Sequence, residues 1–245
     1  MTLRLAMWSG TRNISTAMMR AWENRGDCTV VDEPLYAHYL AHTGLAHPGA
    51  QEVIAAGETD WRKVAAWLTG PVPGGKVIWY QKHMTHHLLP HIGRDWLLGL
   101  RHVFLIRDPR EVLVSYIKSR PEATVEDLGI TQELEIFSYL EDATGRAPPV
   151  IDAGEFLKAP AAQLRALCAE LGVPFTEQML HWPLGPRASD GVWAPYWYGA
   201  VQRSTGFEPY VKEAPVVPAE YAHIVTAAMP AFETLFERRL RATGE

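Results

Sequence analysis

The stretch LRLAMWSGTRNISTAMM, residues 3–19, carries the local signals that decide the fold. Its apolar run at 3–8 predicts a buried strand, and apolar residues spaced three or four apart predict a helix over about 15–25. The intervening loop begins at Gly10, which permits a tight turn. Unpaired backbone N–H groups and the positive end of the helix dipole would suit an anion here. The alternative is an ordinary helix start with Ser15 or Thr16 as its N-cap.

The rest of the chain repeats the pattern of a short strand followed by a helix. Further strands are predicted at 28–32, 76–82, 102–107 and 149–152, and further helices at 61–68, from 109 onward, 132–144, 160–172 and 218–240. Short strands with little alternation of polar and apolar residues indicate a parallel sheet that helices cover on both faces. We therefore predict a three-layer α/β fold formed by one domain over residues 1–245. Within it we expect a helical insert at about 36–69 and an aromatic-rich lid or acceptor loop at about 181–215.

The composition restricts the partners and the compartment. A formal net charge of −5 argues against general binding of nucleic acid or an anionic membrane, although one local basic pocket can still bind a small anion. The N-terminus lacks the features of a signal peptide, and no apolar stretch approaches 18 residues. Cys28 and Cys168 have no partner at metal-ligand spacing, which favours reduced, buried thiols. These features predict a cytoplasmic protein that acts on a small molecule.

A second motif, IRDPREVLVSY at 106–116, follows the fourth predicted strand. Arg107 ends the strand, Asp108 and Pro109 supply an N-cap and a first-turn proline, and Ser115 lies two turns into the helix. The arginine and the serine could together bind a phosphate, whereas the alternative is a simple Arg–Asp pair beside a capped helix. The opening loop has no G-x-x-x-x-G-K-[ST] motif, which counts against an enzyme that hydrolyses nucleotides.

The two motifs together resemble those of sulfotransferases that use 3′-phosphoadenosine-5′-phosphosulfate (PAPS), in particular the bacterial type. TRNIST at 11–16 is similar to the R-S-G-T-[ST] loop of that family, with Asn-Ile in place of Ser-Gly, and RDPREVLVS at 107–115 is similar to its R-[DN]-P-x-x-x-x-x-S element. The resemblance implies a P-loop-like fold, PAPS as co-substrate, 3′,5′-ADP as product and no metal. It also implies a binding site for the 5′-phosphosulfate made by Arg12, Asn13, Ile14, Ser15 and Thr16, and one for the 3′-phosphate made by Arg107 and Ser115.

Sulfuryl transfer requires a base for the acceptor proton and neutralisation of the leaving phosphate. Glu33 stands at the end of the second predicted strand, a position similar to that of the catalytic glutamate of some bacterial and heparan-type sulfotransferases. We therefore favour Glu33 as the base. The alternative is that Glu33 caps the next helix. Asp32 is expected to bind the opening loop or Arg12. His83 is the rival base, because cytosolic sulfotransferases place a histidine near a comparable strand end. Adjacent residues of a strand point to opposite faces of the sheet, so Lys82 and His83 do not both face the site. We expect Lys82 to face it and to donate to the leaving oxygen. Arg12 would add positive charge.

Two further groups have weaker signals. QRSTGF at 202–207 partly matches the late R-K-G-x-x-G segment that closes over the 3′-phosphate, which assigns a binding role to Arg203, Ser204, Thr205 and Gly206. The aromatic residues of the late loop (Trp182, Trp193, Tyr196, Trp197 and Tyr198) form either core or a wall for a flat or sugar-like acceptor. The histidines (His83, His86, His87 and His91, with His38 and His42 one turn apart on a predicted helix) lack acidic or Cys companions. They are interpreted as surface, capping or helix-face residues, and no metal site is predicted.

The leading hypothesis is a PAPS-dependent sulfotransferase that modifies a hydroxyl group, or as second choice an amine, of a small molecule. One alternative is a small-molecule kinase or another enzyme that uses a nucleoside triphosphate. Another is a nucleotide-binding protein that has lost transfer activity, which the Asn13-Ile14 departure keeps open.

Overall fold

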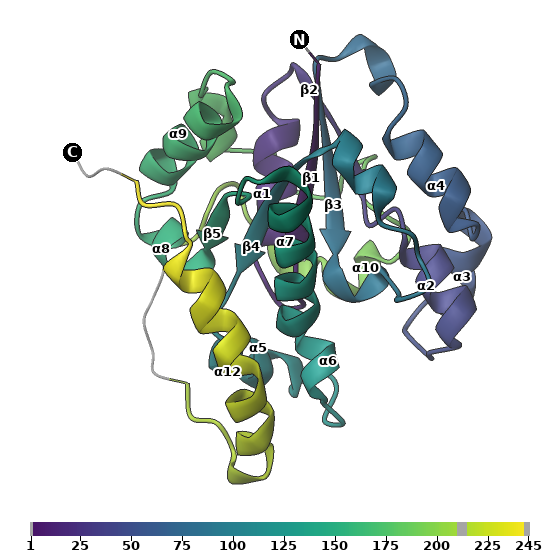
Figure 1. Ribbon diagram of the computed structural model, residues 1–245, viewed down its shortest axis with the longest axis vertical. Helices are drawn as coiled ribbons and strands as arrows, with labels where there is room; N and C mark the ends of the chain where they lie inside the picture. The colour runs from purple at the N-terminus through teal and green to yellow at the C-terminus, as the bar shows by residue number, and fades with distance from the viewer. Residues whose placement is uncertain (1, 210–214, 243–245) are drawn as a thin grey trace.

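The computed structural model describes residues 2–209 and 215–242. Five parallel strands form one sheet in the order β2-β3-β1-β4-β5 (Figure 1). Their bounds are β1 Leu3–Ser9, β2 Cys28–Asp32, β3 Ile78–Met84, β4 Arg101–Ile106 and β5 Val150–Asp152. The predicted strands therefore all form; β3 and β5 are buried throughout, whereas the edge strand β2 is half-buried between its two buried ends. The α/β class and the parallel sheet are confirmed.

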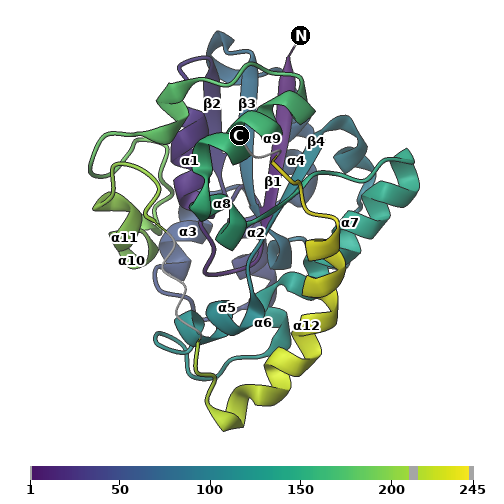
Figure 2. The ribbon, with the colours of Figure 1, turned by 90° about the vertical axis from the view of Figure 1, so that its left-hand side faces the viewer.

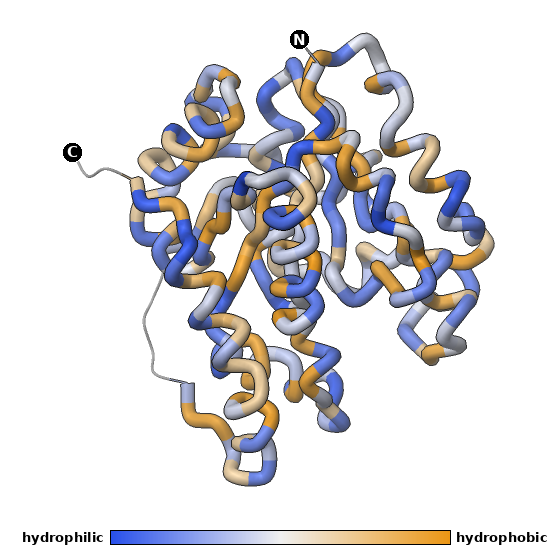
Figure 3. The backbone as a smooth tube through the Cα atoms, in the orientation of Figure 1, coloured by the Kyte–Doolittle hydropathy of each residue, from blue (hydrophilic) through white to orange (hydrophobic). Residues whose placement is uncertain are grey.

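Helices cover both faces of the sheet (Figures 1 and 2). On one face, α1 (Ser15–Glu23), α8 (Ala153–Lys158) and α9 (Pro160–Leu171) pack around Leu5, Met7 and Tyr80. On the other, α4 (Trp61–Leu68), α5 (Pro109–Tyr116), α7 (Ile130–Thr144) and α12 (Ala222–Glu237) pack around Trp8 and Phe104. Figure 3 shows β4 as a hydrophobic run between these layers. Alternate residues of β1 thus belong to two separate cores, as expected for a strand buried on both faces.

The helix boundaries follow the local signals. The Asp60 and Asp108 side chains accept hydrogen bonds from Arg62 N (3.0 Å) and Arg110 N (2.9 Å) and so cap α4 and α5. Gly172 ends α9 with φ 71°, a left-handed conformation that glycine adopts without strain. Pro109 stands in the first turn of α5, where its missing N–H costs no intrahelical hydrogen bond.

The region from 36 to 69 contains α2 (Tyr36–Thr43), α3 (Ala50–Ala56) and α4. Tyr36, Tyr39 and Leu40 of α2 form a third core cluster with Trp193 and Tyr198 of the late segment. That segment contains the short helices α10 (Ala194–Trp197) and α11 (Gly199–Gln202); residues 210–214 of the predicted 181–215 loop lie outside the described residues. The remaining short helices are α6 Val125–Leu128, η1 Pro73–Gly75, η2 Thr85–His87, η3 Asp95–Gly99, η4 Glu177–Leu180 and η5 Ala219–Tyr221. The insert and the late segment therefore pack against each other at one edge of the sheet.

No helix among the described residues has the length and apolar character needed to span a bilayer. Cys28 and Cys168 are both buried and free, and burial raises the pKa of the Cys28 thiol to about 12. Such thiols are protonated and unreactive.

Candidate active site

A cavity of about 1150 Å³ lies at the carboxyl ends of the strands, where ligands bind in open parallel sheets. The chain leaves β1 toward β2 on one side, whereas β4 and β5 lie on the other, so β1 ends at the switch point of the sheet. Most of the residues assigned to binding or catalysis line this cavity: Arg12, Asn13, Ile14, Ser15, Thr16, Glu33, Lys82, Arg107, Ser115, Ser204 and Gly206. Residues separated by up to 194 positions in the sequence thus share one site.

The loop after β1 presents backbone N–H groups to this cavity. Ile14 is the N-cap of α1 and makes no side-chain cap, so the alternative of a Ser15 or Thr16 cap is wrong. The first bond within the helix runs from Met18 N to Ile14 O (2.9 Å), which leaves the N–H groups of Ser15, Thr16 and Ala17 without an acceptor inside the helix. All three residues line the cavity. The start of α1 is therefore arranged to bind an anion.

The conformation of this loop is fixed by two side-chain hydrogen bonds to the backbone of other elements. Asn13 Nδ2 donates to Leu105 O (2.6 Å), and Thr11 Oγ1 donates to Asp127 O (2.8 Å). Arg12 has φ 53°, a left-handed conformation that is strained for a residue with a side chain. Glu33, with φ 40°, is the other such residue in the described part of the chain, and it also lines the cavity. Backbone strain of this kind gathers at functional sites.

Gly10 is required for a different reason than the predicted tight turn. A Cβ atom at this position would lie 2.2 Å from Leu128 O, so the close approach of α6 requires glycine. Gly10 N donates to Glu133 Oε2 (3.2 Å), and Glu133 is only 1% exposed. Burial raises the pKa of this carboxyl well above its usual range, against the opposing effect of the Gly10 N–H. Glu133 therefore supports the loop from below through a carboxyl whose neutral form burial favours.

Arg12, Arg107 and Ser115 come together beside the loop. Arg12 Nε donates to Ser115 Oγ (3.1 Å), and Arg107 Nη1 donates to Arg12 O (3.0 Å). Arg107 also pairs with Glu111 one turn later in α5 (2.9 Å). The Arg–Asp pair and the capped helix of the alternative both form, since Asp108 caps α5 and pairs with Arg110, but Arg107 is not part of that pair. Two sequence motifs 95 residues apart thus form one continuous basic surface.

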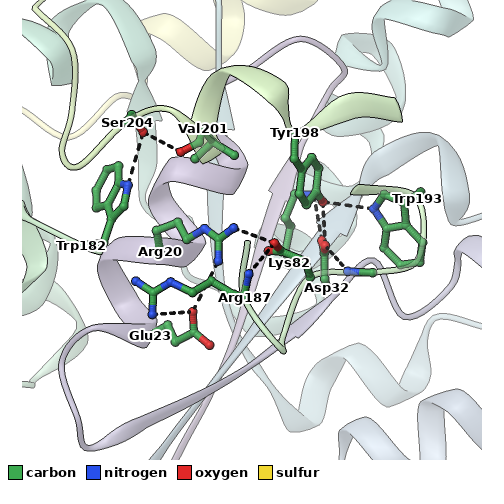
Figure 4. Close-up of polar contacts among 12 residues, drawn as sticks. Arg20, Glu23, Asp32, Lys82, Trp182, Arg187, Trp193, Tyr198, Val201 and Ser204 are labelled. Atoms are coloured by element: carbon green, nitrogen blue, oxygen red, sulfur yellow. Dashed lines mark hydrogen bonds and ion pairs between the residues drawn. The ribbon is translucent and has the colours of Figure 1, made fainter. Parts of the chain in front are cut away.

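Lys82 lies at the centre of a buried polar cluster at the other end of the cavity. Its Nζ donates to Asp32 Oδ1 (2.9 Å), Glu33 Oε1 (2.6 Å) and the Tyr198 hydroxyl (2.7 Å). Tyr198 donates in turn to Asp32 Oδ2 (2.6 Å) and accepts from Trp193 Nε1 (3.1 Å), as Figure 4 shows. Asp32 and Lys82 are register partners on β2 and β3, so their side chains leave the sheet on the same face.

The charges of this cluster are coupled. Burial raises the pKa of Glu33, and the neighbouring Asp32 acts in the same direction, whereas Lys82 opposes both. Although burial alone would favour neutral Lys82, the carboxylates of Asp32 and Glu33 raise its pKa well above the usual range. Lys82 is therefore a stable cation beside a carboxylate whose proton affinity is increased, which is the property of a general base.

His83 points away from this cluster. It is 1% exposed, does not contribute to the described lining of the cavity, and stacks on Trp8, its register partner on β1, with ring centroids 4.4 Å apart. Burial lowers the pKa of His83 to about 3. This placement and the lowered pKa argue against His83 as the base. The expectation for Asp32 is also corrected, because its carboxylate binds Lys82, Tyr198 and Gly191 N (3.2 Å).

The late segment is attached to α1 by two ion pairs, of which the first is buried. Arg20 of α1 pairs with Asp190 (2.7 Å), and Arg187 approaches Glu23 at 3.7 Å (Figure 4). These pairs place α10 and α11 over the cavity, which Trp197 and Tyr198 line. Trp182 and Trp193, in contrast, are buried in core clusters.

The residues of QRSTGF differ in their placement. Ser204 and Gly206 line the cavity, and Ser204 Oγ accepts from Trp182 Nε1 (3.3 Å). Arg203 and Thr205 are exposed and are not among the lining residues that the structure describes. The sequence match alone could not distinguish the lining residues Ser204 and Gly206 from Arg203 and Thr205, because alternate residues of this irregular segment face opposite directions.

Several lining residues were not identified from the sequence. Lys118 and Arg120 follow Ser115 and add positive charge; the signal was present in the string YIKSR. The wall around Glu33 is aromatic and is formed by Tyr36, Tyr39, Tyr116, His47, His86 and His87. Burial lowers the pKa of His47 and of His86 to about 4, so these imidazoles are neutral. The site therefore has one end with Arg12 and Arg107 and an aromatic end, where Arg120 and Asp127 act in opposite directions on the pKa values of Tyr39 and His47.

Comparisons with known proteins identify the fold and the family. Two Arabidopsis thaliana proteins, branched-chain-amino-acid aminotransferase-like proteins 1 and 2, are 36% and 35% identical to the chain over 228 residues. These matches cover 93% of the chain, which spans only 40% of the length of each relative. Among solved structures, the sulfotransferase from Alicyclobacillus acidocaldarius has a TM-score of 0.56 at 13% identity and covers 98% of both chains.

The sulfotransferase domain of the curacin biosynthetic pathway has a TM-score of 0.54 at 14% identity, over 94% of this chain and 98% of that one. At these identities the two structures establish the fold. The family model of the sulfotransferase domain matches residues 3–239, nearly the whole chain. The protein therefore belongs to the sulfotransferase domain family.

Proposed function

We propose that the protein transfers a sulfuryl group from PAPS to a hydroxyl group of an uncharged small molecule. The observation that carries this proposal is one cavity in which a helix N-terminus and a basic surface face a buried Glu33–Lys82 pair. The basic end suits a nucleotide with two separate phosphate groups. The other end suits an acceptor that must lose a proton. An amine is the second choice of acceptor.

The basic end accounts for recognition of the nucleotide. The N–H groups of Ser15, Thr16 and Ala17 would bind the 5′-phosphosulfate at the start of α1, and Arg12 would add a charged donor. Arg107 and Ser115 would bind the 3′-phosphate from the adjoining helix. The hydrogen bond between Arg12 and Ser115 (3.1 Å) supports this division, since it holds the two anion sites at a fixed separation.

The buried pair accounts for the chemistry. In the proposed reaction, Glu33 takes the proton of the acceptor hydroxyl while the acceptor oxygen forms a bond to sulfur. The bond from sulfur to the bridging oxygen breaks, and its electron pair remains on the phosphate of 3′,5′-ADP. Arg12 and the positive end of α1 would stabilise this negative charge. In-line positioning by the cavity supplies the rest of the acceleration.

Lys82 would link the proton transfer to Glu33 with the stabilisation of the leaving oxygen. An ammonium group has three N–H donors, and those of Lys82 already bind Asp32, Glu33 and Tyr198. Once Glu33 is protonated, its attraction for Lys82 falls, so one donor becomes available for the leaving oxygen. Asp32 and Tyr198 would meanwhile hold the ammonium group in position.

Calorimetry with 3′,5′-ADP in the presence of EDTA tests the nucleotide assignment. We expect saturable binding at one site per chain. Charged hydrogen bonds contribute about 1.5–3 kcal/mol each, so Arg107→Ala should weaken binding about 10- to 100-fold. Arg110→Gln is the matched control, because Arg110 belongs to the same helix and its side chain is 50% exposed. Binding of Mg-ATP without any binding of 3′,5′-ADP would overturn the proposal in favour of an enzyme that uses a nucleoside triphosphate.

A further inference from the structure

Three histidines from two separate segments gather beside the cavity. His38 and His42 lie one turn apart on α2, and His91 comes from the segment that follows η2. Their ligand nitrogens all lie within 4.8 Å of one another. Helical spacing alone brought the first two together, but the third comes from 49 positions further along the chain. None of the three is among the described residues that line the cavity.

The hydrogen bonds of His38 fix the state of its ring. His38 Nδ1 lies 2.7 Å from Thr59 O, and a carbonyl oxygen can only accept, so Nδ1 carries the proton. The second ring nitrogen, Nε2, points to His91 Nε2 at 2.9 Å. A ring whose one nitrogen donates to a backbone carbonyl is oriented so that its other nitrogen can bind a metal ion.

The other two histidines complete the set. The rings of His42 and His91 lie with centroids 4.1 Å apart, and both side chains are exposed. Two nitrogens bound to one tetrahedral zinc ion stand roughly 3.3 Å apart, given Zn–N distances of about 2.0–2.1 Å. Small rotations of the two exposed side chains therefore suffice to bring all three nitrogens to one ion.

We infer that His38, His42 and His91 form a binding site for a transition-metal ion, Zn²⁺ above all, with a fourth position open to solvent. An all-imidazole set suits Zn²⁺, Cu²⁺, Ni²⁺ or Co²⁺ and not Mg²⁺ or Ca²⁺. The ion would join α2 to the segment after η2. Both elements supply the aromatic wall of the cavity, Tyr36 and Tyr39 from α2 and His86 and His87 from η2. Its role is therefore structural, and it is separate from the proposed sulfuryl-transfer step.

Titration of the untagged, chelator-treated chain with Zn²⁺ tests this inference. Competition with a chromophoric chelator should show one site per chain. His42→Gln and His91→Gln should each weaken it at least tenfold. Both positions are exposed, so the variants should fold. His223→Gln is the matched control, because His223 is an exposed histidine on α12, and it should bind as the wild type does.

Two readouts separate this site from adventitious binding. Co²⁺ in place of Zn²⁺ should give the intense visible absorption of a tetrahedral ion, and His91→Gln should abolish it. Zn²⁺ should also raise the melting temperature of the wild type and of His223→Gln, but not of His91→Gln. Absence of Zn²⁺ binding by the wild type would overturn the inference. So would binding that survives in both His42→Gln and His91→Gln, since the ion would then lie elsewhere in the chain.

Discussion

Replacement of Glu133 by Gln should change how the stability of the protein depends on pH. Glu133 is 1% exposed beneath the phosphate loop, accepts a hydrogen bond from Gly10 N (3.2 Å), and its Oε1 has no described partner. Burial raises the pKa of this carboxyl well above its ordinary 4.5. The folded protein therefore keeps a proton that the unfolded chain releases.

The sign and the size of the effect follow from proton linkage. A raised pKa contributes stability that is fully present below the unfolded-state value and is lost as the pH rises through the folded-state value. Between the two values, the free energy of unfolding falls by about 1.4 kcal/mol per pH unit because of this one group. The amide that replaces the carboxyl in Glu133→Gln cannot ionise, although its oxygen can still accept from Gly10 N. The difference between wild type and Glu133→Gln should therefore decline with this slope as the pH rises above about 4.5.

Urea denaturation at a series of pH values from about 5 to 8 measures this difference, with the nine tryptophans as the fluorescent probe. All other titrating groups are common to both proteins and cancel. Glu135→Gln is the control, because Glu135 lies one half-turn away on α7 with a side chain that is 59% exposed, and its difference curve should be flat. A flat curve for Glu133→Gln as well would refute the view that a neutral carboxylic acid supports the loop.

Three further substitutions test the site. Glu33→Gln should lower kcat about 10²- to 10⁴-fold. It should also remove the fall of kcat/KM at low pH, because that fall arises when Glu33, whose pKa is raised, becomes protonated and can no longer act as the base. Unchanged turnover would exclude Glu33 from the mechanism. Ser115→Ala should weaken 3′,5′-ADP binding about 2- to 10-fold in calorimetry, since it removes one uncharged hydrogen-bonding group, and equal affinity would exclude a contact with the 3′-phosphate. Gly10→Ala should cost at least about 1–3 kcal/mol in urea denaturation, because its Cβ would lie 2.2 Å from Leu128 O; wild-type stability would show that α6 can move aside.

Most of the sheet was predictable from the sequence because its strands are apolar runs that end in turn or cap signals. β2 has the predicted bounds, and β3 begins two residues later than predicted and continues to Met84. The parity argument for Lys82 and His83 holds because it depends only on the geometry of a strand. The phosphate loop and the second motif were identified because each combines a strand end with a helix start within a few residues.

The remaining parts of the site depend on contacts that no local pattern encodes. Tyr198 reaches Lys82 over 116 positions, from a segment without periodicity. Glu133 lies in an amphipathic helix, where a glutamate normally faces solvent, and only the packing of α7 against β1 shows that it is buried. The grouping of His91 with His38 and His42 could not be predicted either, because it depends on the tertiary packing of α2 against η2. Sequence reasoning therefore found the anion-binding motifs, whereas the buried polar network required the structure.

The central claim is sulfuryl transfer from PAPS, and movement of a labelled sulfuryl group tests it most directly. The protein would be incubated in EDTA with PAPS labelled on sulfur and with a panel of uncharged hydroxyl compounds of aromatic and sugar type. The account predicts that the label moves to at least one acceptor with release of an equal amount of 3′,5′-ADP, and that Glu33→Gln abolishes the transfer while still binding the nucleotide. If the wild type binds PAPS but the label stays on it across the whole panel, the chain is a nucleotide-binding protein and the claim of catalysis is contradicted.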